Sequence, residues 1–432
     1  MNVLVATVNA PHPQRGGGAN RTFQLLRYLR ACGDHLTLLC VATPDEEHYV
    51  DAVHAVCDRV DVIPYFGSSP WRPRLHVGNE RLDRYATLLV EPPYRYAHTF
   101  ASALIERAQA LLATGRFDVL VVEHTAVAFV LAPIKRGQRI PAVAVLHNIE
   151  SILHTRMHVL DRDKSMWART KHTVTRHKIR NAERAIANAY PLVAVTSDHD
   201  AAALDRVVGR RVGAAVVPNG VDTAYFHPLP SVPVKPHTLV FTGLMAHAPN
   251  ADGVRYFRAE ILPLIHRCNP LVRLLVVGAE PPADVREMDE GENGNVRILG
   301  AVPDTRPYIA EGSVIVVPLR SGSGTRLKIL EALAMEQAVV STTIGAEGLQ
   351  VIDGRHVLIA DDPTRFAAAV LRLLEDRTLA ASLGASGRVL VERRYRWESI
   401  GEEWRRTLHA LVSDTASAGG HPVIAAARAR YD

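Results

Sequence analysis

The chain has 432 residues, of which 47% are hydrophobic and 22% are charged, and its formal net charge is +5. These proportions exclude collagen-like, coiled-coil and intrinsically disordered proteins and are typical of a globular enzyme. The length is sufficient for about two or three domains. The positive charge fits an anionic ligand or a membrane surface. A nucleic-acid partner is not expected, because the sequence has no zinc-finger spacing, RNA-binding aromatic motif or basic tail.

The first residues and the cysteines indicate where the protein acts. Residues 1–8 lack the basic and long apolar regions of a signal peptide, so they predict a first strand. No apolar run reaches the ~20 residues that span a bilayer, so any membrane contact is expected to be peripheral. The cysteine spacing matches neither a metal site nor a disulfide framework. Reduced thiols and a cytoplasmic location, including the inner face of the membrane, are therefore expected for Cys32, Cys40, Cys57 and Cys268.

Short apolar runs alternate with helix-length segments along the whole chain. They are continuous rather than alternating, as in strands buried on both faces of a parallel sheet. The sequence therefore predicts an α/β protein with two Rossmann-like, doubly wound domains. The predicted strands are 3–8, 36–41, 60–64, 119–123, 143–147, 192–196, 215–218, 239–243, 272–278, 296–300, 314–319, 339–342 and 357–360.

A proline-rich stretch at 226–236, just after the turn at 218–222, predicts a semi-rigid linker between the domains. We therefore expect an N-terminal domain at 1–220 and a C-terminal domain at 221–396. An amphipathic helix at about 397–415 is expected to pack back onto the first domain. The small and polar tail at 416–432 is predicted to be mobile.

The clearest functional signal is the stretch 321–334, which follows the predicted strand 314–319. Glycines loosen the turn, and a helix is predicted to begin near Thr325. The first N–H groups of a helix attract phosphates, and Arg326 and Lys328 add positive charge at the same place. Lys328, Glu331 and Met335 share one stripe of the helix. The rest of it is predicted to face a core through Leu327, Leu330, Leu333 and Ala334.

This pattern predicts a site for a ligand with phosphates at one end and hydroxyls at the other. The alternative is that Lys328 and Glu331 form only a surface ion pair, worth ~0.2–0.5 kcal/mol.

Two other stretches mix basic residues with aromatic or polar ones. The first covers 65–100 and includes the segments 71–74 and 92–96. The second covers 156–184 and contains nine Lys or Arg against three acids. Each is interpreted either as solvated surface or as a docking surface for anionic lipid headgroups or an anionic acceptor.

Several pieces of the chain, in order and spacing, resemble the retaining glycosyltransferases of family 4, which have the GT-B fold. The resemblance extends over nearly the whole length. Its pieces are Gly16-Gly-Gly-Ala-Asn-Arg21, Leu146-His-Asn-Ile-Glu150, Val217-Pro-Asn-Gly-Val-Asp222, Phe241-Thr-Gly-Leu-Met245, Pro249-Asn250, Val302-Pro-Asp304, the segment 322–334, Ile344-Gly-Ala-Glu-Gly348 and Arg396-Trp-Glu398.

The resemblance implies a donor site in a deep cleft between two Rossmann-like domains. Glu331 matches the second Glu of the family's E-x7-E motif, which holds the donor ribose. The first Glu is replaced by Ser323, as in the Gly-Thr-Arg-Leu-Lys variant of this motif. Backbone N–H groups around residues 322–325, including those of Gly324 and Thr325, are expected to take the place of that carboxylate.

Arg326 and Lys328 are expected to neutralise the diphosphate, because the basic residues common after Gly243 are replaced here by Ala246-His-Ala-Pro-Asn250. The resemblance places Gly243 at the donor. Gly16, Gly17 and Gly18 would let the backbone approach the donor, or they are a plain connection.

His147, at the end of a predicted strand, matches the family's His near the sugar; the alternative is a core His that is satisfied by backbone. Glu123, His124 and Asn148 are expected on the acceptor side.

The expected reaction is transfer of a sugar from a nucleoside diphosphate sugar to an acceptor hydroxyl with retention, through an oxocarbenium-like transition state. Neither a metal nor another cofactor is expected. The acceptor is expected to be a glycan or lipid-linked intermediate of the cell envelope or an exopolysaccharide, or else a small natural product. The alternatives are an epimerase or a phosphorylase on the same scaffold, or an inactive sensor of nucleotide sugars.

Overall fold

Each predicted apolar run overlaps a strand in the computed structural model, which describes residues 1–12, 16–43, 46–65, 87–89, 92–94, 99–137, 140–160, 165–322 and 324–417. The chain divides into two units, which are described separately. The first comprises Met1–Pro218 and the chain from Gly401 on, and the second is Asn219–Ile400. The predicted boundary between residues 220 and 221 lies next to this division.

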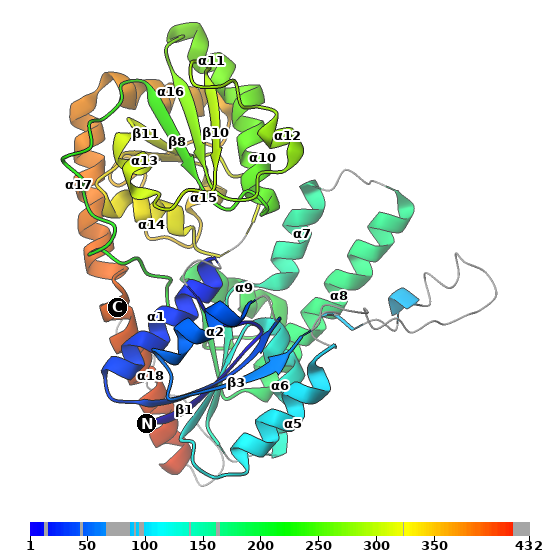
Figure 1. Ribbon diagram of the computed structural model, residues 1–432. Helices are drawn as coiled ribbons and strands as arrows, with labels where there is room; N and C mark the ends of the chain where they lie inside the picture. The colour runs from blue at the N-terminus through cyan, green and yellow to red at the C-terminus, as the bar shows by residue number, and fades with distance from the viewer. Residues whose placement is uncertain are drawn as a thin grey trace. The chain divides into compact units, whose positions relative to one another are not determined.

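The first unit is built on a seven-stranded sheet in the order β3-β2-β1-β4-β5-β6-β7. Every neighbouring pair is parallel; Val3, for example, is aligned with both Leu36 and Val119. The apolar runs are buried because helices cover the sheet (Figure 1). The strands are β1 (Asn2–Thr7), β2 (His35–Ala42), β3 (Arg59–Pro64), β4 (Val119–Glu123), β5 (Ala142–Leu146), β6 (Leu192–Val195) and β7 (Ala215–Val216).

The helices of this unit connect successive parallel strands, as the predicted strand–helix alternation requires. Helices α7 and α8 pack against each other (Figure 1). The described helices are α1 (Gly17–Ala31), α2 (Glu47–His54), α5 (Ala101–Leu112), α6 (Thr125–Gly137), α7 (Glu150–Leu160), α8 (Met166–Ala189) and α9 (Asp198–Val208).

The second unit has a six-stranded parallel sheet in the order β10-β9-β8-β11-β12-β13. Both sheets therefore run outward in two directions from a central strand, which is the doubly wound arrangement. The strands are β8 (Thr238–Thr242), β9 (Arg273–Val277), β10 (Val296–Gly300), β11 (Val314–Val317), β12 (Val339–Ser341) and β13 (Leu358–Ile359).

One helix of this unit starts later than the sequence predicts. Helix α14 begins at Leu327 rather than near Thr325, because Arg326 is still extended (φ −86°, ψ 95°), and it ends at Ala334, so that Met335 follows it. The helical elements are α10 (Ala248–Tyr256), a π-helical turn η3 (Phe257–Ile261), α11 (Leu262–Cys268), α12 (Ala283–Arg286), α13 (Arg306–Glu311), α14 (Leu327–Ala334), α15 (Thr343–Ala346), α16 (Pro363–Glu375) and α17 (Arg377–Arg394).

Helix α18 (Trp397–Ser417) carries the chain from the second unit back to the first, and its residues from Gly401 on belong to the first unit. The buried Trp404 lines a small cavity together with Leu25, Leu26 and Leu29 of α1.

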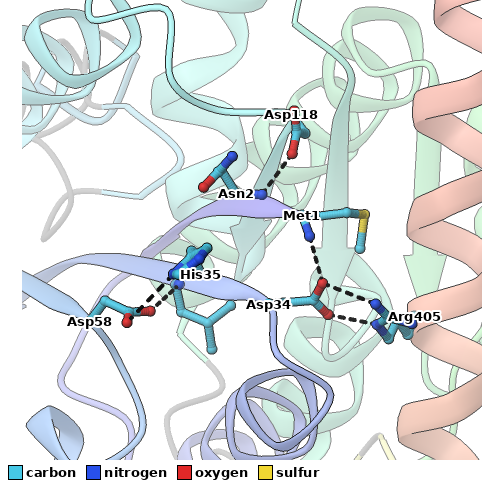
Figure 2. A network of polar contacts seen from close by, with 8 residues as sticks. Met1, Asn2, Asp34, His35, Asp58, Asp118 and Arg405 are labelled. Carbon is cyan, nitrogen blue, oxygen red and sulfur yellow. Dashed lines mark hydrogen bonds and ion pairs between the residues drawn. The ribbon is translucent and has the colours of Figure 1, made fainter.

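An ionic contact fastens α18 to the first unit. Arg405 donates to the buried carboxylate of Asp34 over 2.7 Å, and the amino group of Met1 donates to it over 2.7 Å (Figure 2).

Several predictions fall on residues outside those described. They concern the segment 71–74, Arg95, Tyr96, Arg162, Lys164, Ser323 and the tail from residue 418. Among the described helices, none is both long enough and apolar enough to cross a membrane.

Replacing Asp34 by asparagine is expected to lower the free energy of unfolding by about 3 kcal/mol, because two cationic partners lose a fully buried counter-charge. Chemical denaturation measures this change. The matched control on α18 is Glu403→Gln, since the Glu403–Arg406 pair is more than half exposed and is expected to contribute under about 1 kcal/mol. Equal effects of the two substitutions would contradict the role given to Asp34.

The same contacts set an acid limit to stability. Burial raises the pKa of Asp34, but hydrogen bonds and charges from Arg405 and the Met1 amine outweigh burial and hold the pKa below its ordinary value. Because the folded-state pKa is depressed, this stabilisation is present above about pH 4 and is lost as the pH falls through that pKa. The difference between wild type and Asp34→Asn is expected to shrink below about pH 4.

Candidate functional site

In the first unit, the carboxyl ends of β4 and β5 bring several of the predicted residues together. Glu123 ends β4 and is followed by His124, whose φ of 71° is unusual for a residue other than glycine. His147 and Asn148 follow β5. Because ligands of doubly wound sheets bind beyond the carboxyl ends of the strands, this edge is where a site is expected.

Glu123 and His147 form a close buried pair. Oε2 of Glu123 lies 2.6 Å from Nε2 of His147, and the two residues are 2% and 9% exposed. The ring of His124 lies 4.1 Å from that of His147, centroid to centroid. One oxygen of the Glu123 carboxyl group is thus engaged by His147.

Burial keeps both histidines neutral. Loss of hydration lowers the pKa of His147 to about 3, and the charge of Arg21 lowers it further in the same sense. Burial and His147 lower the pKa of His124 to about 3, against the opposing charge of Glu123. His147 is therefore suited to accept or donate a hydrogen bond rather than to carry a charge.

The predicted glycines lie at the start of α1, next to this pair. Gly16 precedes the helix with φ 114°, and Gly17 is its first residue. A Cβ atom on Gly18 would lie 2.8 Å from Nδ1 of His147. The backbone of α1 therefore comes so close to the imidazole that a side chain at position 18 would displace it, which is more than a plain connection requires.

In the second unit, the turn between β11 and α14 gathers the predicted cations. Arg326 is 9% exposed, and its Nη1 donates to the carbonyl of Gly324 over 2.8 Å. A Cβ atom on Gly322 would lie 2.7 Å from Nη2 of Arg326, so this glycine makes room for the guanidinium. The side chain folds back over the turn, and the helix begins one residue later.

Lys328 is held by contacts from two other segments. Its Nζ donates to Oδ1 of Asn250 over 2.9 Å and lies 4.0 Å from the centroid of the Phe241 ring. Burial and the charge of Arg326 lower the pKa of Lys328 to about 7, although Glu331 opposes this. An anionic ligand would supply the missing negative charge and would favour the protonated amine.

Glu331 lies on the same helix but is not paired with the lysine. Among the described residues, Lys328 and Glu331 make no ion pair with each other, so the surface ion-pair interpretation is wrong. Burial raises the pKa of Glu331 to about 7, against the charge of Lys328. Its carboxyl group has no hydrogen-bond partner within the described part of the chain and is suited to two ligand hydroxyls.

Two hydroxyl groups complete this cluster. Oγ of Ser321 and Oγ1 of Thr325 are buried, and neither has a hydrogen-bond partner among the residues that the structure describes. Buried polar atoms are nearly always paired, so these hydroxyls are suited to a polar ligand at the turn. Ser323, the position of the missing carboxylate, lies outside the described residues.

Three residues of the two clusters were not assigned a role from the sequence. Asn250 holds the Lys328 amine, and Arg21 is a buried cation beside Glu123. His247 has its pKa lowered by burial and by the charges of Arg326 and Lys328. Arg21 and Asn250 stand in segments that carry the family resemblance, which is the one sequence signal that could have identified them.

The sequence also has two Asp-x-Asp triplets, the pattern found in metal-dependent sugar transferases. Asp200, in the triplet 198–200, accepts hydrogen bonds from Thr196 and Ser197 over 2.7 Å each, and the Ser197 hydroxyl caps α9 by accepting from the Asp200 N–H. The triplet 161–163 lies outside the described residues.

Two family models match the chain. The model described as Glycosyltransferase Family 4 matches residues 15–225, and the model described as Glycosyl transferases group 1 matches residues 236–376. Together they cover both units.

Curated relatives and a solved structure agree with these matches. A phosphatidyl-myo-inositol mannosyltransferase of Mycolicibacterium smegmatis is 30% identical over 51% of this chain and only 56% of its own length. The Mycobacterium leprae enzyme of the same name is 25% identical over 92% of this chain and 94% of its own. The structure of Anabaena Alr3699/HepE with UDP and glucose has a TM-score of 0.67 at 16% identity, covering 95% of this chain and all of that one, and shows the same fold.

Proposed function

Because the chain belongs to the family 4 glycosyltransferases and has the GT-B fold, we propose that it transfers a sugar from a nucleoside diphosphate sugar to an acceptor hydroxyl with retention of anomeric configuration. The observation that carries the proposal is the cluster at the β11–α14 turn, where two cations, two buried hydroxyls and a carboxyl group lie together. This combination matches a diphosphate joined to a ribose.

The chemistry follows from where charge develops. As the glycosyl bond breaks, negative charge grows on the departing diphosphate and the sugar becomes oxocarbenium-like. Arg326 and Lys328 interact more strongly with that growing charge than with the intact donor, which lowers the barrier. Backbone N–H groups around Gly243 and Gly324 would add to the phosphate contacts.

Glu331 would hold the ribose hydroxyls, and His147, with the backbone of Gly18 beside it, would contact the donor sugar. No bound metal is assigned to the step. The leaving phosphate would take the acceptor proton, with Asn148 beside the acceptor.

The relatives suggest where the reaction is used. Those named above are mannosyltransferases that act on phosphatidyl-myo-inositol. We therefore favour a mannosyl donor and a lipid-linked or glycan acceptor of the cell envelope over a small natural product.

The test is a thermal-shift panel of nucleoside diphosphate sugars, followed by product analysis with and without EDTA. A donor at 100 times its Kd stabilises by about 2.7 kcal/mol, so the correct base and sugar should stand out. We expect transfer that EDTA does not reduce and a product with the donor's anomeric configuration. An isomerised sugar formed from donor alone would support an epimerase, and binding without transfer or hydrolysis would support a sensor.

We propose that the protein also contacts anionic membrane through α7 and α8. In the basic stretch 156–184, Arg169 and Lys171 are exposed, and Met166 is 73% exposed at the start of α8. A basic residue near an anionic surface contributes about 1 kcal/mol. Arg169→Gln with Lys171→Gln should therefore weaken flotation with anionic liposomes at least about tenfold. The control is Lys235→Gln with Arg365→Gln, which removes exposed charges of the second unit. Unchanged liposome binding by the Arg169→Gln, Lys171→Gln variant would reject membrane contact through α8.

A further inference from the structure

Helix α1 carries a cation into the interior of the first unit. Arg21 is 1% exposed, and its Nη1 donates to the carbonyl of Pro218 over 2.7 Å. A carbonyl satisfies a hydrogen-bond donor but does not balance a buried charge, which needs an anion nearby. Among the residues that the structure describes, the anion that acts on Arg21 is Glu123 at the end of β4. The charge of the Arg21 guanidinium therefore acts on both Glu123 and His147.

Glu123 is subject to two opposing effects. Burial raises the pKa of Glu123 above its ordinary value, and the charge of Arg21, with a smaller effect from His124, opposes that rise. If the raised pKa lay above the working pH, Glu123 would be a neutral acid whose O–H donates to Nε2 of His147. If Arg21 holds it below the working pH, Glu123 is a carboxylate that accepts from Nε2–H. The 2.6 Å separation of Oε2 and Nε2 fits either arrangement, because both contain one proton between the same two atoms.

The two arrangements differ at the other nitrogen of the ring. With the proton on Nε2, Nδ1 of neutral His147 is a hydrogen-bond acceptor; with the acid on Glu123, the ring proton sits on Nδ1, which becomes a donor. Nδ1 is the atom that a Cβ on Gly18 would approach to 2.8 Å, so it points toward the first turn of α1. The state of Glu123 thus decides whether this edge of the site accepts or donates a hydrogen bond.

Three ionisable groups face His147 within the described part of the chain. They are Arg21 from α1 and Glu123 and His124 from the end of β4. His124 is neutral at ordinary pH, so Arg21 is the charge that decides the outcome.

We propose that Arg21 is a positioning residue whose buried charge keeps Glu123 ionised, so that His147 carries its proton on Nε2 and presents Nδ1 as the acceptor for a donor-sugar hydroxyl. The sugar contact rests on the proposed function, whereas the placement of the proton does not. Arg21 acts through Glu123 and His147 and is not expected to touch the substrate.

The test is nuclear magnetic resonance of the full chain labelled with nitrogen-15 in its histidines, between about pH 5 and pH 8. The two neutral tautomers are distinguished by which ring nitrogen carries the proton, and comparison with His147→Gln identifies the signals. In the wild type we expect His147 protonated at Nε2 throughout this range. Arg21→Gln removes the charge but keeps a polar amide in its place, and it should move the proton to Nδ1 or add a second one.

Arg21→Lys keeps the charge and should keep the wild-type tautomer, and Arg27→Met, at an exposed position of the same helix, should change nothing. Retention of the wild-type tautomer in Arg21→Gln would overturn the proposal. If Arg21→Gln does not fold, the wild type decides: the Nε2–H form supports the proposal and the Nδ1–H form overturns it.

Kinetics then separate this proposal from the proposed function. With a competent donor, Arg21→Gln should lower kcat at least about tenfold, and Arg21→Lys should recover most of it. A wrong histidine tautomer is known to reduce catalysis in other enzymes. A wild type with the expected tautomer but no transfer would reject the function and leave the inference about Arg21 standing. Normal transfer by an Arg21→Gln enzyme with an altered tautomer would reject the acceptor role of Nδ1.

Discussion

Replacing Lys328 by alanine is expected to lower the turnover number for sugar transfer about 100-fold or more. The amine is held by Asn250 and the Phe241 ring and lies in a cluster with Arg326, where charge would develop on the departing diphosphate. Removing one preorganised charge from such a site costs more in the transition state than in the bound donor, so kcat should fall more than donor affinity. Steady-state kinetics with the donor found in the thermal-shift panel measure both.

The neighbouring carboxyl group gives the second half of this test. Glu331→Ala should also lower turnover about 100-fold or more, and because ribose binding is lost it should raise the KM for the donor as well. The different effects on KM are the reason for making both variants. Thermal unfolding of each should remain close to wild type, since the apolar face of α14 is untouched.

The matched control is Lys235→Ala. This lysine is 63% exposed and pairs with Glu311 over 2.7 Å in the same unit. An exposed pair of this kind contributes under about 1 kcal/mol, so neither stability nor transfer should change much. If Lys328→Ala transferred sugar as fast as this control, the role of charge stabilisation at the β11–α14 turn would be rejected.

The strands of this protein could be predicted from sequence because both sheets are parallel and buried. The run 314–319, for example, contains β11 (Val314–Val317), every residue of which is buried. In an α/β protein, a continuous apolar run of this length is typical of a strand that is buried on both faces of a parallel sheet. The position of Lys328 and Glu331 on one helix could also be predicted, because spacing along a helix is a local property.

What the sequence did not predict depends on contacts across long separations. Helix α14 starts at Leu327 because the Arg326 side chain folds back onto the Gly324 carbonyl. Helix propensities do not predict such a contact. Asn250 reaches Lys328 from 78 positions away, and Arg21 reaches Pro218 from 197 positions away. From the sequence alone, Arg21 is indistinguishable from a basic residue on the exposed face of an amphipathic helix; only the structure shows that it is buried.

Replacing Gly243 by alanine is the second large effect that we expect, about a 100-fold loss of transfer. Gly243 follows β8 with φ 148°, and a Cβ there would lie 2.7 Å from Nζ of Lys328 and 2.9 Å from Nδ2 of Asn250. These atoms are the ends of side chains, so the fold can accommodate the methyl group by moving the lysine. The amine would then leave the position that the diphosphate requires, and a displacement of about 1 Å can cost this much.

The control for Gly243→Ala is Gly354→Ala. Gly354 also has a positive φ, 72°, but a Cβ there would meet no atom within 4 Å. Both substitutions strain the backbone by about 1–3 kcal/mol, so both should lower the midpoint of thermal unfolding. Transfer should fall only in Gly243→Ala, because only there does the new methyl group displace the Lys328 amine. Equal transfer by the two variants at a temperature where both are folded would mean that the position of this amine does not limit the reaction.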